Sequence, residues 1–121
     1  MSWRRDTGDS FETRALQQLE QAGLSLLDRN FNTRYGELDL IMRDTDTVVF
    51  VEVRYRRGED FGGALASVTT GKRKRLVLAA RLYLQTHPQL AQQPCRFDVL
   101  AFAGPETQPE SRWLRNAFDA F

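Results

Sequence analysis

Apolar residues recur at helical spacing in three parts of the chain. The first part covers residues 9–22 and is followed by Gly23, a typical helix stop. The second covers residues 70–86 and is closed by Pro88. The third, residues 113–121, predicts a short C-terminal helix, with a frayed tail as the alternative.

Other segments have the composition of strands. They are residues 24–30, 37–42, 48–55 and 96–102, of which 48–55 is the strongest because β-branched and aromatic residues fill it. Residues 56–66 contain three glycines and no periodicity, which predicts a loop. The order αβββαβ, followed by the C-terminal helix, predicts an α/β fold with a mixed central sheet flanked by helices, in a single domain over residues 1–121.

Two strands that otherwise look buried each carry a carboxylate. Asp39 lies between two leucines and Glu52 between two valines, where an unpaired ionised carboxylate costs several kcal/mol. If these two strands form a hairpin, its loop is either residues 45–46 or residues 44–47. In both cases, residues that face each other across the hairpin have numbers that sum to 91. Asp39 then faces Glu52, Glu37 faces Arg54, and all four side chains project from one face.

This carboxylate pair has two interpretations. It is either a partly buried salt-bridge cluster neutralised by Arg54, or a hard-cation site for Mg²⁺ or Mn²⁺. In the second case Asp39, Glu52 and the backbone carbonyl of Val53 are the expected ligands. Glu12 borders the apolar stripe of the first helix, so it is either a third carboxylate of the site or an acid that favours the helix dipole.

The chain has 121 residues, a mass of 13.9 kDa and a net charge of +1, but its charge is unevenly distributed. Residues 1–53 hold 6 basic and 10 acidic side chains, whereas residues 54–81 hold 8 and 2. Four consecutive basic residues at the start of a helix are unfavourable for stability, which favours an anionic partner over a solvated face. The side chains predicted to contact nucleic acid are Arg56, Arg57, Lys72, Arg73 and Arg75.

Two features bear on the cellular compartment. Cys95 is the only cysteine, so no internal disulfide forms and a reducing cytoplasm is expected. The N-terminus leads into no apolar signal region, and no apolar run approaches the roughly 18 to 20 residues of a membrane span. We therefore expect a cytoplasmic protein with no membrane partner.

Several of these residues together resemble a known family. They are Glu12, the segments 36–41 and 51–56, Ser67-Val68, Lys72, Arg75-Leu76 and the segment 96–99. From about Gly8 to Phe121 the chain resembles the YraN family of uncharacterised bacterial proteins. That family is similar in turn to the PD-(D/E)xK nuclease superfamily, and especially to archaeal-type Holliday junction resolvases.

The resemblance implies a restriction-endonuclease-like core and a set of roles. Asp39 matches the motif Asp, Glu52 the motif acid and Glu12 the helix carboxylate, which makes all three catalytic candidates. Arg54 stands where the superfamily has Lys; it stays protonated, so it can stabilise charge on a phosphate but cannot act as a base. By analogy with junction resolvases, a homodimer is expected.

The resulting hypothesis is a nucleic-acid-binding protein with a Mg²⁺- or Mn²⁺-dependent endonuclease fold, acting on branched or damaged DNA. One alternative is a DNA-binding module that keeps the scaffold without the reaction. Another is an interaction protein in which the acidic cluster is structural and an aromatic C-terminus, Trp113, Phe118 and Phe121, docks a partner or a second copy of the chain.

Overall fold

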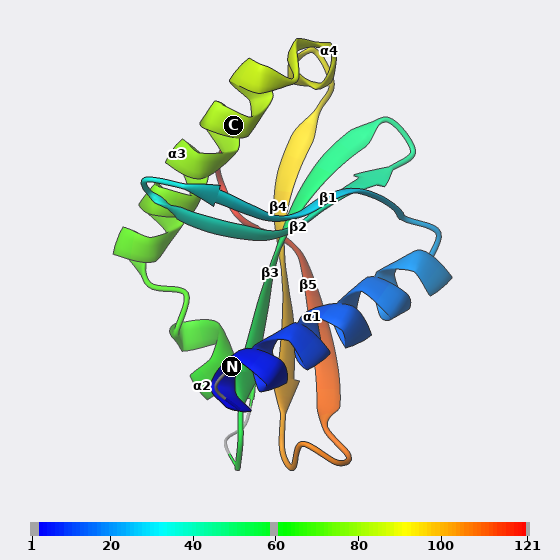
Figure 1. Cartoon of the computed structure of the whole chain (residues 1–121), viewed down its shortest axis with the longest axis vertical. Helices are drawn as coiled ribbons and strands as arrows, with labels where there is room; N and C mark the ends of the chain where they lie inside the picture. The colour runs from blue at the N-terminus through cyan, green and yellow to red at the C-terminus, as the bar shows by residue number, and fades with distance from the viewer. Residues whose placement is uncertain (1–2, 59–60, 121) are drawn as a thin grey trace.

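The computed structural model describes residues 3–58 and 61–120, with only the backbone for residues 3–9. The elements are α1 (Trp3–Gln21), β1 (Ser25–Thr33), β2 (Gly36–Asp44), β3 (Thr47–Arg56), α2 (Phe61–Ala66), α3 (Thr70–Thr86), α4 (Pro88–Ala91), β4 (Cys95–Ala103) and β5 (Glu110–Phe118) (Figure 1). Within these described ranges, no helix is both long and apolar enough to cross a membrane.

The strands form one mixed sheet in the order β1-β2-β3-β4-β5. The first three strands are antiparallel, β3 and β4 are parallel, and β5 returns antiparallel to β4. The parallel step needs a crossover, which α2, α3 and α4 supply. The predicted single α/β domain with a mixed sheet is therefore confirmed.

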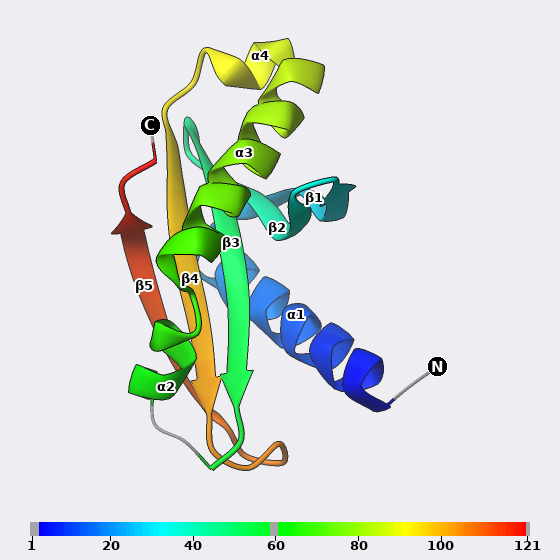
Figure 2. The same cartoon turned by 90° about the vertical axis from the view of Figure 1, so that its left-hand side faces the viewer.

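Helices cover both faces of this sheet (Figures 1 and 2). The α1 side chains Phe11, Ala15 and Leu19 pack with alternate residues of β2 and β3 in one core. The α3 residues Leu76 and Tyr83 pack in a second core with the other sheet residues. Residues 48–51 are at most 2% exposed, because each face of β3 is covered by one of these two cores.

The hairpin between β2 and β3 has the predicted register. Asp44 pairs with Thr47, so the loop is the two residues 45 and 46, and Thr45 has the positive φ of 58° that such tight turns require. The ladder continues to the pair Leu40 and Val51. It ends there, so the predicted strand pairs Asp39–Glu52 and Glu37–Arg54 are not part of the ladder, although Asp39 and Glu52 are the next residues on their strands.

The loop predicted for residues 56–66 was wrong in its second half, where α2 forms. Its glycines are poor helix formers, but Ala64 is fully buried, and Leu65 packs against the core that contains the α3 residues Leu76 and Tyr83. The Ser67 hydroxyl also donates to the carbonyl of Ala64 at 2.6 Å. Tertiary packing thus stabilises a single helical turn that has little intrinsic propensity.

The predicted C-terminal helix was also wrong, because residues 110–118 form β5. The register with β4 shifts between the pairs Phe97–Phe118 and Val99–Leu114, and Asn116 there has a φ of 50°. This β-bulge breaks the alternation of a strand and leaves apolar residues at spacings that resemble a helix. Phe121, included in that prediction, lies outside the described residues.

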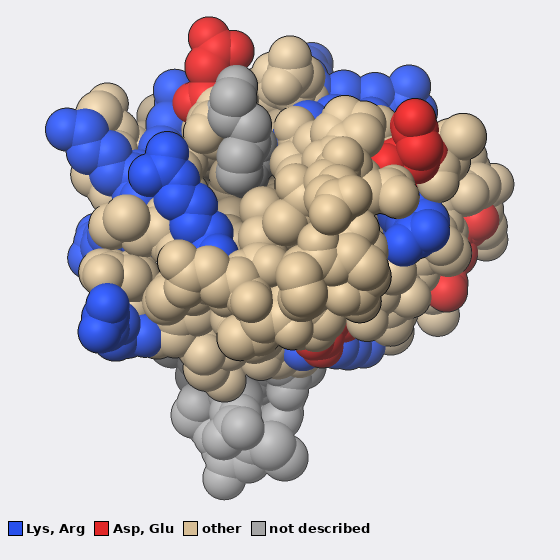
Figure 3. Space-filling model, turned by 90° about the horizontal axis from the view of Figure 1, so that it is seen from above, with Lys and Arg blue, Asp and Glu red and all other residues tan. Residues whose placement is uncertain are grey.

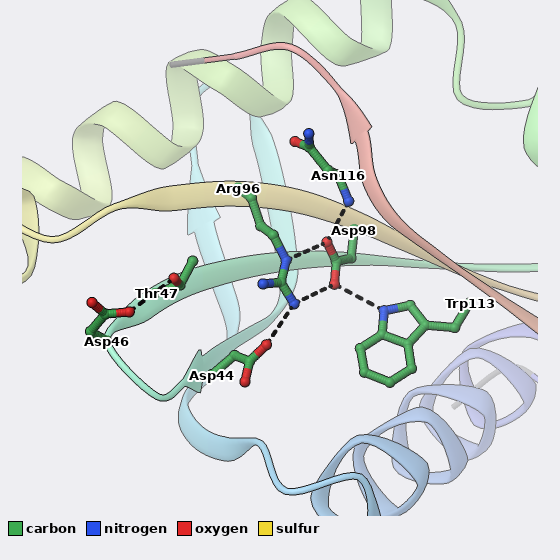
Figure 4. Close-up of polar contacts among 7 residues, drawn as sticks. All are labelled: Asp44, Asp46, Thr47, Arg96, Asp98, Trp113 and Asn116. Carbon is green, nitrogen blue, oxygen red and sulfur yellow. Dashed lines mark hydrogen bonds and ion pairs between the residues drawn. The ribbon is translucent and has the colours of Figure 1, made fainter.

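A fully buried carboxylate joins β4 to β5. Asp98 accepts hydrogen bonds from Arg96 Nε at 3.0 Å, from Trp113 Nε1 at 2.9 Å and from the backbone N–H of Asn116 at 2.9 Å (Figure 4). Arg96 also reaches Asp44 at 3.0 Å and so ties β2 to the same group. Donors surround the carboxylate and offset its desolvation, so this group holds the β5 edge in register.

We expect Asp98→Asn to lower the free energy of unfolding by about 3–5 kcal/mol, because it leaves Arg96 with Asp44 as its remaining charge partner and places a buried amide against N–H donors. Urea denaturation checks this. The matched control is Asp46→Asn in the exposed hairpin turn, with an expected effect within about 0.5 kcal/mol. Equal losses in the two variants would contradict the assignment.

Candidate functional site

Asp39 and Glu52 meet where the β2–β3 ladder ends. Asp39 Oδ2 accepts the backbone N–H of Val53 at 2.9 Å, which fixes its carboxyl group on the neighbouring strand. Its side chain also shares a hydrogen bond with Glu52, which is 4% exposed. Two carboxyl groups in hydrogen-bond contact require a proton or a cation between or beside them.

Burial and neighbouring acids change the acidity of Asp39. Loss of solvent is the largest cause, followed by the hydrogen bond and the charge of Glu52, and together they raise the pKa of Asp39 from an ordinary 3.8 to about 10. The Val53 N–H opposes this shift, and the charge of Glu12 adds to it. Without a bound cation, Asp39 therefore holds a proton at neutral pH.

Two further carboxylates approach Asp39. One oxygen each of Glu12, Glu37 and Asp39 lie within 4.8 Å of one another. Asn30 Nδ2 bridges the first two, donating to Glu12 at 2.6 Å and to Glu37 at 3.0 Å, while Arg29 lies 4.0 Å from Glu12. Glu12, which the sequence left open between two interpretations, thus lies in the acidic cluster.

Glu52 is neutralised on its other side. Its Oε2 atom lies 3.2 Å from Lys72 Nζ and 3.4 Å from Arg54 Nη2. Neither contact has hydrogen-bond geometry, and among the described residues both Glu52 Oε2 and Arg54 Nε are buried without a hydrogen-bond partner. The salt-bridge interpretation therefore describes Glu52, whereas Asp39 is surrounded by acids.

The start of α3 brings Lys72 to this point. Thr69 is the N-cap, and its hydroxyl accepts the Lys72 backbone N–H at 3.2 Å. This fixes the first turn, and the Lys72 side chain points towards the sheet, where it contacts Glu52. The lysine is 34% exposed, so its ammonium group contacts both Glu52 and solvent.

These groups line a cavity of about 830 Å³. Four elements contribute to its wall: Phe11 and Glu12 of α1, residues 35–37 and 39 around the start of β2, residues 52–56 of β3, and Lys72, Arg75 and Leu76 of α3. Carboxylates lie beside arginine and lysine side chains in one space. Such a space can hold a cation and a phosphate next to each other.

The predicted basic residues divide between two places. Arg56, Lys72 and Arg75 line the cavity. Arg73 does not, because its Nε donates to the Val68 carbonyl at 3.0 Å and its guanidinium lies 5.3 Å from the ring of Phe118. Arg57 is exposed and lies outside the cavity wall. Figure 3 shows the molecule from above, and several Lys and Arg side chains gather on its left, the side on which α3 lies in Figure 1.

Sequence reasoning missed two residues of this site. Asn30 bridges the acids, and the signal for it was present, since asparagine is uncommon inside strands. Tyr35 lies between β1 and β2 and lines the cavity. Its sequence signal was an aromatic residue in a turn, where small and polar residues are usual.

Comparisons with known proteins identify relatives of the whole chain. The model of the uncharacterised protein family UPF0102 matches residues 11–102. A UPF0102 protein of Stutzerimonas stutzeri (strain A1501) is 52% identical over 120 residues, covering 99% of this chain and 100% of the relative. A UPF0102 protein of Xanthomonas campestris pv. campestris (strain B100) is 55% identical over 115 residues, covering 95% of this chain and 93% of the relative.

The raised pKa of Asp39 predicts a pH dependence of stability. Between about pH 4 and about pH 10, Asp39 keeps its proton in the folded protein but has released it in the unfolded chain. The free energy of unfolding therefore falls as the pH rises through this range. We expect the Tm, measured without divalent ions, to fall by several degrees from about pH 5 to about pH 9. Asp39→Asn, which is neutral at every pH, should flatten this decline, whereas Asp46→Asn should not. Parallel profiles for Asp39→Asn and the wild type would contradict the prediction.

Proposed function

The chain belongs to the family UPF0102, and from the cavity described above we propose that it binds nucleic acid and hydrolyses phosphodiester bonds with Mg²⁺ or Mn²⁺. The proposed substrate is branched or damaged DNA. The relation to PD-(D/E)xK nucleases, which the comparisons do not address, is part of the proposal. So is a homodimer, because two symmetrical cuts in a junction need two sites.

The observation that carries the proposal is the arrangement of opposite charges in one cavity. Carboxylates from α1, β2 and β3 line it together with Arg54, Lys72 and Arg75. Hydrolysis of a phosphodiester needs both a cation near the attacked phosphate and donors for its oxygens. A structural salt-bridge cluster alone does not account for Glu12, Glu37 and Asp39 lying together.

The donor set fits a hard divalent cation. Carboxylate and carbonyl oxygens are the ligands that Mg²⁺ and Mn²⁺ prefer, and Asp39 has acidic neighbours on two sides. Asp39, Glu52 and the Val53 carbonyl would hold the ion, with Glu12 beside them. When bound, the ion supplies a lowered pKa for its coordinated water and neutralises charge on the phosphate.

The basic residues act on the phosphate. Arg54 Nε is buried and has no hydrogen-bond partner among the described residues, so a turn of the guanidinium into the cavity would let its N–H donate to a phosphate oxygen without breaking a hydrogen bond of that atom. Lys72 and Arg54 contact Glu52 in the protein, and they would be free to contact the substrate if Glu52 held a cation. Arg56 and Arg75 extend the basic wall to flanking phosphates.

One observation favours a second candidate, a DNA-binding module without catalysis. Lys72 and Arg54 already neutralise Glu52 within the protein, so part of the acidic site is balanced without a metal. The interaction-protein alternative finds less support, because Trp113 packs against the α1-side core and Phe118 stacks on Phe97 with ring centroids 4.8 Å apart.

Cleavage of labelled four-way junctions, flaps and duplexes with Mg²⁺ or Mn²⁺ tests catalysis. We expect the wild type to cut at least one of them and Asp39→Asn or Glu52→Gln to lower the rate by about 10²–10³-fold, because each removes a proposed ligand of the cation that stabilises charge on the phosphate. Asp46→Asn, which removes the same charge from the exposed turn, should cut at the wild-type rate.

Identical product patterns for the wild type and both site variants would remove catalysis from the proposal. DNA affinity measured at increasing salt concentrations then shows whether the protein is a DNA-binding module or does not bind nucleic acid through this cavity. Affinity that falls with salt and weakens in Lys72→Ala and Arg75→Ala supports the binding module. Affinity that is independent of salt rejects nucleic-acid binding through this cavity.

A further inference from the structure

Tyr35 places an aromatic ring in the cavity wall that neither core uses. It lies in the turn between Thr33 and Gly36, and its side chain is half-buried. Both cores are built without it. Among the described residues, the ring contact recorded for Tyr35 is with the Arg34 guanidinium, 5.0 Å from its centroid. Within residues 10–58 and 61–120, whose side chains the structure describes, the ring has this cationic neighbour and no recorded aromatic one.

The turn holds Tyr35 in place by its own hydrogen bonds. The Thr33 hydroxyl accepts the Tyr35 backbone N–H at 3.0 Å and donates to the Gly36 carbonyl at 2.8 Å. Gly36 has a φ of 137°, which L side chains rarely adopt. The backbone at Tyr35 is thus fixed by the turn itself.

The same cavity holds the basic side chains Arg56, Lys72 and Arg75. An aromatic ring beside a basic wall is the combination with which proteins bind single strands, since bases stack on the ring while cations contact the backbone. A base within a duplex has both faces covered by its neighbours and cannot stack on a protein ring unless it leaves the helix.

We infer that the cavity takes an unpaired nucleotide of a nucleic-acid strand, with the base against the ring of Tyr35 and neighbouring phosphates near Lys72 and Arg75. The inference rests on the proposed function and names its substrate class. Strands with unpaired bases, such as flaps, gaps and single strands, are the substrates, and a fully paired duplex is not.

Binding without metal tests this independently of cleavage. Fluorescence anisotropy in EDTA compares a labelled oligothymidylate with an abasic strand of the same length, which has the same phosphates but no bases. We expect the wild type to bind the oligothymidylate about tenfold more tightly. Tyr35→Ala should remove this preference and leave abasic binding unchanged, whereas Tyr35→Phe, which keeps the ring, should retain it.

Leu114→Ala is the control, since it truncates an exposed apolar side chain on β5, at the opposite edge of the sheet. It should bind both strands as the wild type does. Equal affinity of the wild type for the two strands, or a preference that survives Tyr35→Ala, would overturn the inference. Competition by thymidine monophosphate as strong as by the oligonucleotide would also overturn it, because neighbouring phosphates would then contribute nothing.

These outcomes are separate from those of the cleavage assay. A Tyr35-dependent base preference in a protein that cuts no substrate would support the inference and reject catalysis. Metal-dependent cleavage of paired and unpaired strands at equal rates, with no base preference, would support the proposed function and reject the inference.

Discussion

The two-residue turn between β2 and β3 is the constraint on which the site depends. It fixes the register at Leu40 opposite Val51, so the next residues outward are the two acids. Side chains alternate along a strand, so a slip by one residue would send Asp39 and Glu52 to opposite faces of the sheet. The rest of the cavity is assembled around this pair, from α1 on one side and the start of α3 on the other.

The two acids are neutralised in different ways. Glu52 is almost fully buried, and Lys72 and Arg54 approach it from the basic part of the chain. Asp39 faces Glu52 and Glu12, and burial among these acids raises its pKa to about 10. One carboxyl group is therefore balanced by fixed charges, and the other by a proton.

Asp98 shows what a purely structural carboxylate looks like in the same fold. It is fully buried, but donors from Arg96, Trp113 and Asn116 surround its oxygens. Asp39 receives one backbone N–H and otherwise has acidic neighbours. Both carboxyl groups are buried, so what distinguishes them is their partners: hydrogen-bond donors around Asp98 and acids around Asp39. On this basis Asp98 has a structural role, and Asp39 belongs to the candidate site.

Local pattern by itself determined α1, the first four strands, α3 and the β2–β3 register up to Leu40 and Val51, because periodicity and turn length are properties of neighbouring residues. It misassigned residues 113–118, since a bulge set by pairing with β4 gives a strand helix-like spacing. It also could not place Asn30 beside the acids or Tyr35 in the cavity wall. Those positions depend on how separate elements pack together, and only the tertiary structure decides that.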